Sequence, residues 1–525
     1  MLYRSTLLSF LILSVGYILL NPWWFGDAIW YATDISSNPP FLVEPGHVLW
    51  RPLGLFVWKL LVLVVPSTTP LFAFQFICSV LSAGGVAIFF AVCLELGLEK
   101  RSSLLATVMY AGSHFMVSYA GSGSSYAPSL SFLLAAFYFA LRPELRFSKT
   151  LSILSVVMAW GLWSITSLTV LGIGYAAALQ RRKPLIRDTL LYAFSAGALC
   201  LTLCFLAYLS ADKVEAPENS FVQWLVSSGH GIPARLSFSN TLRALLGAFL
   251  THIYLFDIGT QLKLALYRRT LSSVSPSLGA ALTACLIFSS LFGLSLWHSL
   301  RRLSAASSRQ GVVTASLSLA PILLFGLIWQ GSDIERLCFL IPVTSFLFGF
   351  GLQRSFLLKV AAILIVGSNL GFRVFPTVFS GGGESGQLTR LVENHTKPHS
   401  LLVIHGQRFS ISSWTAAQYF SKRDFHSILY DVQTNGEKAW QKRLNSSMTK
   451  AWENGGAVWV LAPLLSTEHT SQAEHALQMN PEFPVPSVSQ VCQFFMTFQK
   501  TGRSFSIGKL EFLEISHERE RAEVR

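Results

Sequence analysis

The chain has 525 residues, of which 52% are hydrophobic and only 13% are charged, against about 25% charged residues in a typical soluble protein. This excludes an ordinary soluble enzyme, a disordered chain and a disulfide-stabilised scaffold. The 40 Lys and Arg residues outnumber the 27 Asp and Glu residues by 13. Because 40 Phe and 14 Trp residues exceed what one globular core needs, we expect an integral membrane protein.

Apolar runs long enough to cross a bilayer follow one another along most of the chain. A bilayer core of about 30 Å requires about 20 apolar residues in a helix. The first run, residues 5–20, has no small-residue cleavage site after it, so we interpret it as an uncleaved transmembrane helix. The other single spans are expected at 71–94, 103–119, 125–141, 189–209, 277–299, 312–330, 336–352 and 355–372.

The apolar stretch 150–179 is too long for one span. Gly161, Gly172 and the polar segment 164–167 allow it to form a hairpin of two short spans, which gives about eleven spans in total. Only with this hairpin do all short basic loops fall on the cytoplasmic side, as the positive-inside rule requires. The residues of these loops are Lys100, Arg101, Arg142, Arg146, Lys149, Arg181, Arg182, Lys183, Arg187, Arg301, Arg302, Arg309, Arg354 and Lys359.

The excess positive charge belongs to the membrane part. Residues 1–372 contain 24 basic and 13 acidic residues, whereas residues 373–525 contain 16 and 14. The cytoplasmic loops fix the orientation and meet anionic membrane lipid, so the basic charge does not indicate a nucleic-acid partner. The outside segments are 21–70, 210–276, the short turn 330–335 and everything after about residue 373.

Two apolar segments are interrupted by charged residues and are not expected to cross the membrane. A crossing at residues 53–65, which contain Lys59, would invert the charge bias of every later loop. We therefore expect a helix lying at the outer membrane surface. Residues 241–267 are interpreted in the same way, as a surface or re-entrant helix.

After Pro376 the composition becomes that of a soluble domain, so we divide the chain into a membrane domain, 1–379, and a soluble α/β domain, 380–525. Residues 380–386 (SGGGESG) are typical of a linker. A parallel sheet core is expected, with strands at 401–404, 457–461, 493–498 and 510–515 and helices at 411–420, 438–453 and 472–478. Residues 405–407 (His-Gly-Gln) end the first strand, where such sheets bind ligands.

Ionisable residues gather in the first outside loop. Asp27 follows the first helix directly, and Asp34, Glu44, His47 and Arg51 complete five such groups within 25 residues. Placing an acidic side chain beside a membrane costs free energy, so such residues are candidates for a functional role. A partly desolvated carboxylate such as Asp27 is a candidate general base. The alternative is that Asp27 and Asp34 are solvated loop acids or helix caps.

A second candidate region is the outside turn that contains Glu335 and Arg336. An Arg at the mouth of a membrane bundle suits a two-point grip on a phosphate. The alternative is an interfacial Arg paired with Glu335. Residues of the long outside loop are candidates for covering a cavity, namely His230, Arg235, His252 and Asp257, whereas His114 and Tyr119 are interpreted as packing residues.

These motifs resemble the GT-C superfamily of integral-membrane glycosyltransferases. The matching residues are Gly26-Asp27 after the first helix, the segment 47–53 (HVLWRPL), and Glu335-Arg336 before the helix with Pro342. The resemblance covers the architecture of the membrane domain and includes a C-terminal soluble domain outside. The acidic doublet of protein mannosyltransferases is absent, because Ala28 follows Asp27. The Trp-Trp-Asp-Tyr-Gly signature of oligosaccharyltransferases is absent too, so the acceptor is left open.

The resemblance implies a transferase that moves a hexose or pentose from a polyprenyl-phosphate donor to an acceptor hydroxyl. It implies Asp27 as the base and Arg336 near the lipid phosphate. Asp34, Glu44, His47, Arg51 and Glu335 are the remaining candidate substrate-binding residues. Whether a divalent metal assists is left open.

The expected location is the bacterial inner (plasma) membrane, with the C-terminal domain outside the cytoplasm. One alternative is a non-catalytic subunit that keeps this fold in a larger protein complex. The other is a transporter, which would place polar residues near mid-membrane and show internal repeats that we do not find in the sequence.

Overall fold

The structure is a computed structural model. It describes residues 2–20, 27–211, 220–227, 236–254, 286–287, 290, 293–294, 297, 320–328, 334–352, 356–404, 411–428, 431–432, 439–465, 488–507 and 510–519. The chain divides into two compact units, Met1–Val378 and Phe379–Arg525.

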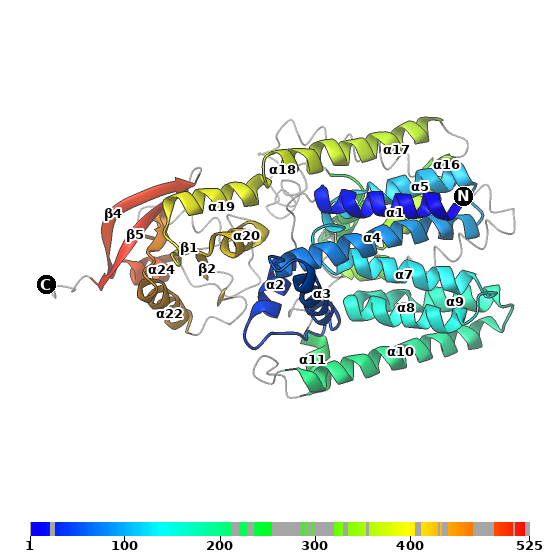
Figure 1. Ribbon diagram of the computed structural model, residues 1–525, viewed down its shortest axis with the longest axis horizontal. Helices are drawn as coiled ribbons and strands as arrows, with labels where there is room; N and C mark the ends of the chain where they lie inside the picture. The colour runs from blue at the N-terminus through cyan, green and yellow to red at the C-terminus, as the bar shows by residue number, and fades with distance from the viewer. Residues whose placement is uncertain are drawn as a thin grey trace. The chain divides into compact units, whose positions relative to one another are not determined.

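The first unit is helical, and its long helices run side by side (Figure 1). Its helices are α1 (Leu2–Leu19), α2 (Ala28–Ser36), α3 (Trp50–Val64), α4 (Pro70–Glu95), α5 (Lys100–Ala111), α6 (His114–Tyr119), α7 (Tyr126–Leu141), α8 (Ser148–Leu162), the 3-10 helix η1 (Ser164–Thr169), α9 (Val170–Gln180), α10 (Leu185–Ser210), α11 (Phe221–Ser227), α12 (Phe238–Leu250), α16 (Leu340–Leu352), α17 (Phe356–Asn369), the π-helical turn η2 (Leu370–Val374) and α18 (Phe375–Phe379). Residues 320–328 are helical as well.

Three of the described helices are long and apolar enough to cross a membrane, namely Pro70–Glu95, Leu185–Ser210 and Leu358–Phe379. Five shorter apolar helices accompany them within the described residues. Their exposed faces carry large apolar side chains, among them Phe194 and Leu209 of α10. The structure therefore agrees with a polytopic helical membrane protein. The expected span 277–299 and part of 312–330 lie outside the described residues.

The helix boundaries differ from the expected spans at several places. The predicted hairpin 150–179 is two helices, α8 and α9, with η1 between them. The expected span 103–119 is divided into α5 and α6 at Gly112 and Ser113, because the Ser113 hydroxyl caps a new helix by accepting from the Met116 amide at 3.4 Å. The expected span 336–352 becomes helical only at Leu340.

The two ends of the bundle differ in charge. The basic turns after α4, α7 and α9 lie at the same end as the N-terminus, on the right in Figure 1. Helices α2, α3 and α11 lie at the opposite end. The described basic turns therefore gather on one side, as the positive-inside rule requires, whereas Arg301, Arg302, Arg309 and Arg354 lie outside the described residues.

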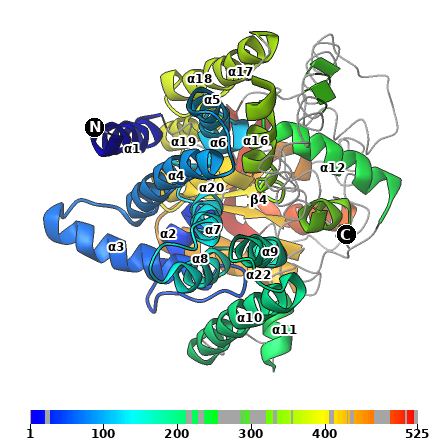
Figure 2. The same ribbon diagram turned by 90° about the vertical axis from the view of Figure 1, so that its right-hand side faces the viewer.

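Helix α3 lies across the direction of the long helices (Figure 2). Its inner face buries Trp50, Arg51 and Gly54, whereas Phe56 and Leu63 of its outer face are exposed. One buried and one exposed apolar face is the pattern of a helix that lies in a membrane surface, as expected for residues 53–65.

The second unit is built on a five-stranded mixed sheet with the order β2-β1-β3-β5-β4. Strands β1 (Leu401–Ile404), β2 (Asp424–Ser427) and β3 (Val458–Leu461) are parallel, whereas β5 (Leu510–Arg519) pairs antiparallel with β3 and with β4 (Phe498–Ile507). The remaining elements of this unit are α19 (Gly383–His395), α20 (Ile411–Ser421), α22 (Trp440–Glu453), the 3-10 helix η3 (Ala462–Leu465) and α24 (Val488–Phe495).

Two expectations for this unit were wrong, and strands β2 and β4 were not predicted. The first half of the segment 493–498, expected as a strand, is the end of helix α24, whose buried Val491, Cys492 and Phe495 follow helical spacing, and Phe498 is the first residue of β4. The expected linker 380–386 includes the first turn of α19. Strand β2 was not predicted, because it has four residues and Phe425 is its only large apolar one. Residues 405–407 and the expected helix 472–478 lie outside the described residues.

The charge asymmetry predicts which end of the bundle faces the cytoplasm. Six of the seven cysteines are described and are buried, and Cys285 lies outside the described residues. With Cys285 replaced by serine, a cysteine introduced at exposed Ser37 or Glu144 can be labelled selectively. In bacterial spheroplasts, a membrane-impermeant maleimide should label Ser37→Cys before lysis and Glu144→Cys only after lysis. The reverse pattern would show that the chain is inverted.

Candidate active site

Asp27 lies at the start of α2 but does not cap it with its side chain. The Tyr126 hydroxyl, from the start of α7, donates a short hydrogen bond to Asp27 Oδ2. The Tyr31 hydroxyl, one turn into α2, lies 3.4 Å from the same oxygen. The helix-cap alternative for Asp27 is therefore excluded, since the carboxylate bonds across the bundle to α7.

Arg51 of α3 is 4% exposed and is enclosed by partners. Its Nε lies 2.7 Å from Asp34 Oδ2 and its Nη1 lies 2.5 Å from Glu44 Oε2. The guanidinium also stacks over the rings of Tyr31 and Phe41, at 4.7 and 4.9 Å from their centroids. Burial disfavours the charge, but Glu44 and Asp34 outweigh it and raise the pKa of Arg51 above its ordinary value.

This cluster changes the role expected for three residues. Two carboxylates and two rings surround Arg51, so its charge is already paired within the first loop and it is poorly placed to bind a substrate phosphate. We therefore assign Arg51, Asp34 and Glu44 to holding the first outside loop against α2 and α3. Composition alone could not distinguish these uses, because a pairing Arg and a phosphate-binding Arg look alike in sequence.

His47 is 8% exposed and lies between the rings of Tyr31 and Tyr126, at centroid distances of 5.8 and 5.7 Å. Its Nδ1 lies 2.7 Å from the carbonyl oxygen of Leu162 and 2.9 Å from Ser125 Oγ. Because a carbonyl can only accept, Nδ1 carries the proton and Nε2 is the basic nitrogen. Burial lowers the pKa of His47, although the Glu44 carboxylate opposes the shift, so the ring is neutral near pH 7.

The turn of Glu335 and Arg336 precedes α16 and reaches the same region. The Tyr119 hydroxyl, at the end of α6, donates to Glu335 Oε1 at 2.7 Å. The Tyr119 ring packs edge-on against Tyr126, with 5.8 Å between the ring centroids. The structure therefore gathers Asp27, His47 and Glu335, with its chain neighbour Arg336, around the two tyrosines, although they lie far apart in sequence.

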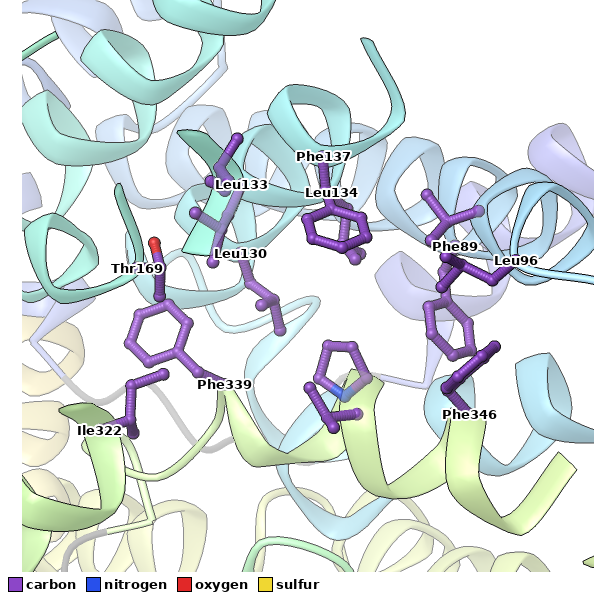
Figure 3. Close-up of a pocket in the computed structure, with 14 residues that line it drawn as sticks. Phe89, Leu96, Leu130, Leu133, Leu134, Phe137, Thr169, Ile322, Phe339 and Phe346 are labelled. Carbon is purple, nitrogen blue, oxygen red and sulfur yellow. The ribbon is translucent and has the colours of Figure 1, made fainter. Parts of the chain in front are cut away.

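An apolar groove of about 630 Å³, its open side included, lies between helices of the first unit (Figure 3). Among the described residues that line it, Thr169 is the only polar one. Its apolar lining comes from α4, α7, α9, the helix at 320–328 and the start of α16, with Leu130, Phe137, Phe339 and Phe346 among the side chains. Trp163 connects the groove to the site, because it stacks on Phe339 at 5.0 Å and packs edge-on against Tyr126 at 4.9 Å.

Sequence reasoning missed part of this site and included residues that lie elsewhere. Tyr31, Tyr126 and Trp163 were not singled out. The only local signal was the Tyr that follows the turn 121–125 (GSGSS). His252 belongs to a separate buried cluster, in which its Nε2 contacts Thr344 and its backbone carbonyl accepts from Asn369. His230, Arg235 and Asp257 lie outside the described residues.

His114 packs in the interior and contacts the carbonyl oxygen of Leu250 at 2.6 Å, as expected for a packing residue. Tyr119 is buried and its ring stacks on Phe115, as expected for a packing residue, and its hydroxyl also donates to Glu335. Within the part of the chain that the structure describes, no group of three or more His, Cys, Asp or Glu side chains could hold a metal ion.

Solved structures share this fold. The crystal structure of ArnT from Cupriavidus metallidurans bound to undecaprenyl phosphate is 11% identical, with a TM-score of 0.55 over 98% of this chain and 97% of that chain. The apo form of the same protein is also 11% identical, with a TM-score of 0.56 over 98% of each chain. No family model matches this chain, and no curated protein is similar to it in sequence.

At this identity the likeness concerns the fold, and it extends over both units of the chain. The chain therefore has the fold of the ArnT structures over 98% of its length.

The Arg51 cluster predicts a local stability effect. Arg51→Ala would leave Asp34 and Glu44 close together without their shared cation. Breaking a fully buried pair costs about 3–5 kcal/mol. We expect about 2–3 kcal/mol here, because both carboxylates are partly exposed. Thermal unfolding in detergent measures the loss. The matched control is Arg187→Ala, whose partner is Asp188 and whose side chain is 70% exposed, and it should leave the midpoint unchanged. Equal effects of both variants would contradict a special role for Arg51.

The buried imidazole of His47 predicts acid sensitivity. An unfolded His binds a proton near pH 6.5, whereas burial lowers the pKa of His47 in the folded protein. Stability should therefore fall as the pH drops below about 6.5, by up to about 1.4 kcal/mol per pH unit. His47→Asn keeps a donor for the Leu162 carbonyl but cannot titrate. The difference in unfolding midpoint between pH 7.5 and 5.5 should be smaller in this variant. An unchanged difference would show that other groups cause the acid sensitivity.

Proposed function

We propose that this protein is a membrane glycosyltransferase that moves a sugar from a polyprenyl-phosphate donor to an acceptor hydroxyl at the outer membrane surface. The observation that carries the proposal is the carboxylate of Asp27. Tyr126 and Tyr31 bind one of its oxygens, and helix α2, which Asp27 directly precedes, lies at the end of the bundle opposite the basic turns (Figure 1).

Asp27 is suited to accept a proton. Both tyrosine hydroxyls bind Oδ2, and none of the described residues donates a hydrogen bond to Oδ1. Oδ1 is therefore the oxygen available to an incoming hydroxyl. A base must come within about 2.6–3.2 Å of the proton that it removes, and the fixed position of Oδ2 orients Oδ1 for this contact.

The donor consists of an apolar isoprenoid chain and a charged phosphate-linked sugar, and the protein offers a suitable surface for each part. The apolar groove suits an isoprenoid chain, because its lining offers hydrocarbon and aromatic surface. Arg336, three residues before the groove residue Phe339, suits the lipid phosphate through its planar pair of donors. The ArnT structure with bound undecaprenyl phosphate supports this class of lipid, because it has the same fold.

The proposed reaction is one displacement at the anomeric carbon. The acceptor oxygen forms the new glycosidic bond while the bond between the anomeric carbon and the phosphate oxygen breaks. The acceptor proton passes to Asp27 Oδ1, and the lipid phosphate leaves with the bonding electron pair. Arg336 stabilises the negative charge that develops on this phosphate. Because the donor is lipid-anchored, the reaction takes place at the membrane surface.

We place the protein in the bacterial inner membrane. The basic turns would face the cytoplasm, and Asp27 and the second unit would lie outside it. A polyprenyl-phosphate sugar in the outer leaflet could then enter the groove sideways from the lipid.

Asp27→Asn should lower kcat by at least about 100-fold, because general bases contribute roughly 10²–10⁴-fold. The assay uses membranes that contain the protein and a panel of undecaprenyl-phosphate sugars with radiolabelled sugar. It measures label incorporated into membrane glycolipid and glycoprotein. Asp188→Asn, in the first turn of α10 at the basic end, is the control and should retain full activity.

Folding of Asp27→Asn is checked by its unfolding midpoint, which should stay close to that of the unmodified protein. Full transfer by this variant would exclude Asp27 as the base. Failure of the unmodified protein to transfer sugar from any donor of the panel would favour the non-catalytic subunit.

A further inference from the structure

We propose that the corner between α6 and α7, residues 119–126, is a positioning element. It sets the position of Asp27, the proposed base, relative to Arg336, the proposed phosphate-binding residue. This inference rests on the proposed function and adds two positioning residues to it, Tyr119 and Tyr126. Neither is a catalytic residue in this proposal, because each acts through the acidic residue that it holds.

The two tyrosines lie at the two ends of the corner and reach different parts of the site. Tyr126 donates to Asp27 Oδ2. Tyr119 donates to Glu335 Oε1 at 2.7 Å, and Glu335 is the neighbour of Arg336 in the chain. The two rings contact each other edge-on, with a centroid distance of 5.8 Å. One short segment therefore connects the start of α2 with the turn before α16.

The corner itself is rigid. Every residue from 112 to 131 is buried. The Trp50 Nε1 donates to the Gly123 carbonyl at 3.1 Å, and Cys78 Sγ lies 3.2 Å from the Tyr119 carbonyl and 3.3 Å from that of Ser124. The corner is therefore anchored to α3 and α4.

The glycines of the corner permit this close packing. Gly123 has a φ of +92°, which favours glycine. A Cβ atom at Gly121 would lie 2.2 Å from the carbonyl oxygen of Tyr17 in α1. The corner can therefore not shift without moving α1, α3 or α4, and the two hydroxyls keep a fixed separation.

Trp163 gives the corner a third contact with the site. It packs against Tyr126 on one side and against Phe339 on the other. Phe339 follows Arg336 by three residues and lines the groove, so the packing fixes the end of the turn that Tyr119 holds at Glu335.

The arrangement predicts different kinetic losses from two chemically identical changes. Tyr126→Phe removes a donor to the base, so we expect kcat to fall about 10- to 100-fold, as for a lost hydrogen bond to a charged group, with little change in the donor KM. Tyr119→Phe loosens the turn that carries Arg336. We expect the donor KM to rise about 10-fold or more, with kcat less affected.

The experiment compares these two variants with Tyr110→Phe and Asp27→Asn in the radiolabel transfer assay. Tyr110 is a matched control, because it is fully buried in the same bundle and its hydroxyl has no hydrogen-bond partner among the described residues. Its variant should keep both kcat and KM. Binding of undecaprenyl phosphate, followed by its effect on the unfolding midpoint, should weaken in Tyr119→Phe and stay unchanged in Tyr126→Phe.

The outcomes separate this inference from the function on which it rests. Transfer by Asp27→Asn would overturn the proposed function. Loss of transfer in Asp27→Asn, with both phenylalanine variants behaving like Tyr110→Phe, would overturn the positioning role alone. A lower unfolding midpoint with unchanged kinetics would also overturn it and leave the corner as structure. If Tyr119→Phe does not fold, Glu335→Ala tests the same contact from its other side.

Discussion

The hydrogen bond between Tyr126 and Asp27 is the interaction on which the arrangement of the site depends. A carboxylate at the edge of an apolar bundle loses much of its hydration and requires donors from the protein. Helix α2 supplies Tyr31, and α7 supplies Tyr126. Because the second donor comes from another helix, satisfying the charge also fixes α2 against α7. His47 then fits between the two tyrosine rings.

The need to pair buried charges also explains why two arginines near the site have different roles. Arg51 forms ion pairs with Asp34 and Glu44, so its charge stabilises the first loop. Arg336 lies in the turn before α16, next to Glu335, whose carboxylate accepts a hydrogen bond from Tyr119 at 2.7 Å. The first loop thus provides a rigid wall, and the late turn brings a cation to the region where a lipid phosphate would lie under the proposed function.

Sequence patterns predicted those features that depend on neighbouring residues in the chain. Apolar length and basic loops indicated most described helices and the division of 150–179, and the gathering of ionisable residues in outside segments pointed to Asp27, His47 and Glu335. Tyr126 could not be found this way, because it lies 99 residues from Asp27 and its hydroxyl reaches the carboxylate only when the helices have packed. Helix α24 and strand β2 were missed because short segments take their structure from tertiary packing.

The groove and the polar cluster divide recognition between them. The described lining of the groove is apolar except for Thr169, so it can hold a hydrocarbon chain but offers little to distinguish one sugar from another. Discrimination requires polar groups whose partners would be missing with the wrong substrate. Such groups lie on the other side of Trp163, around Asp27, His47 and Glu335. Under the proposed function, lipid affinity and sugar selectivity are therefore set by separate residues, and Trp163 is the boundary between them.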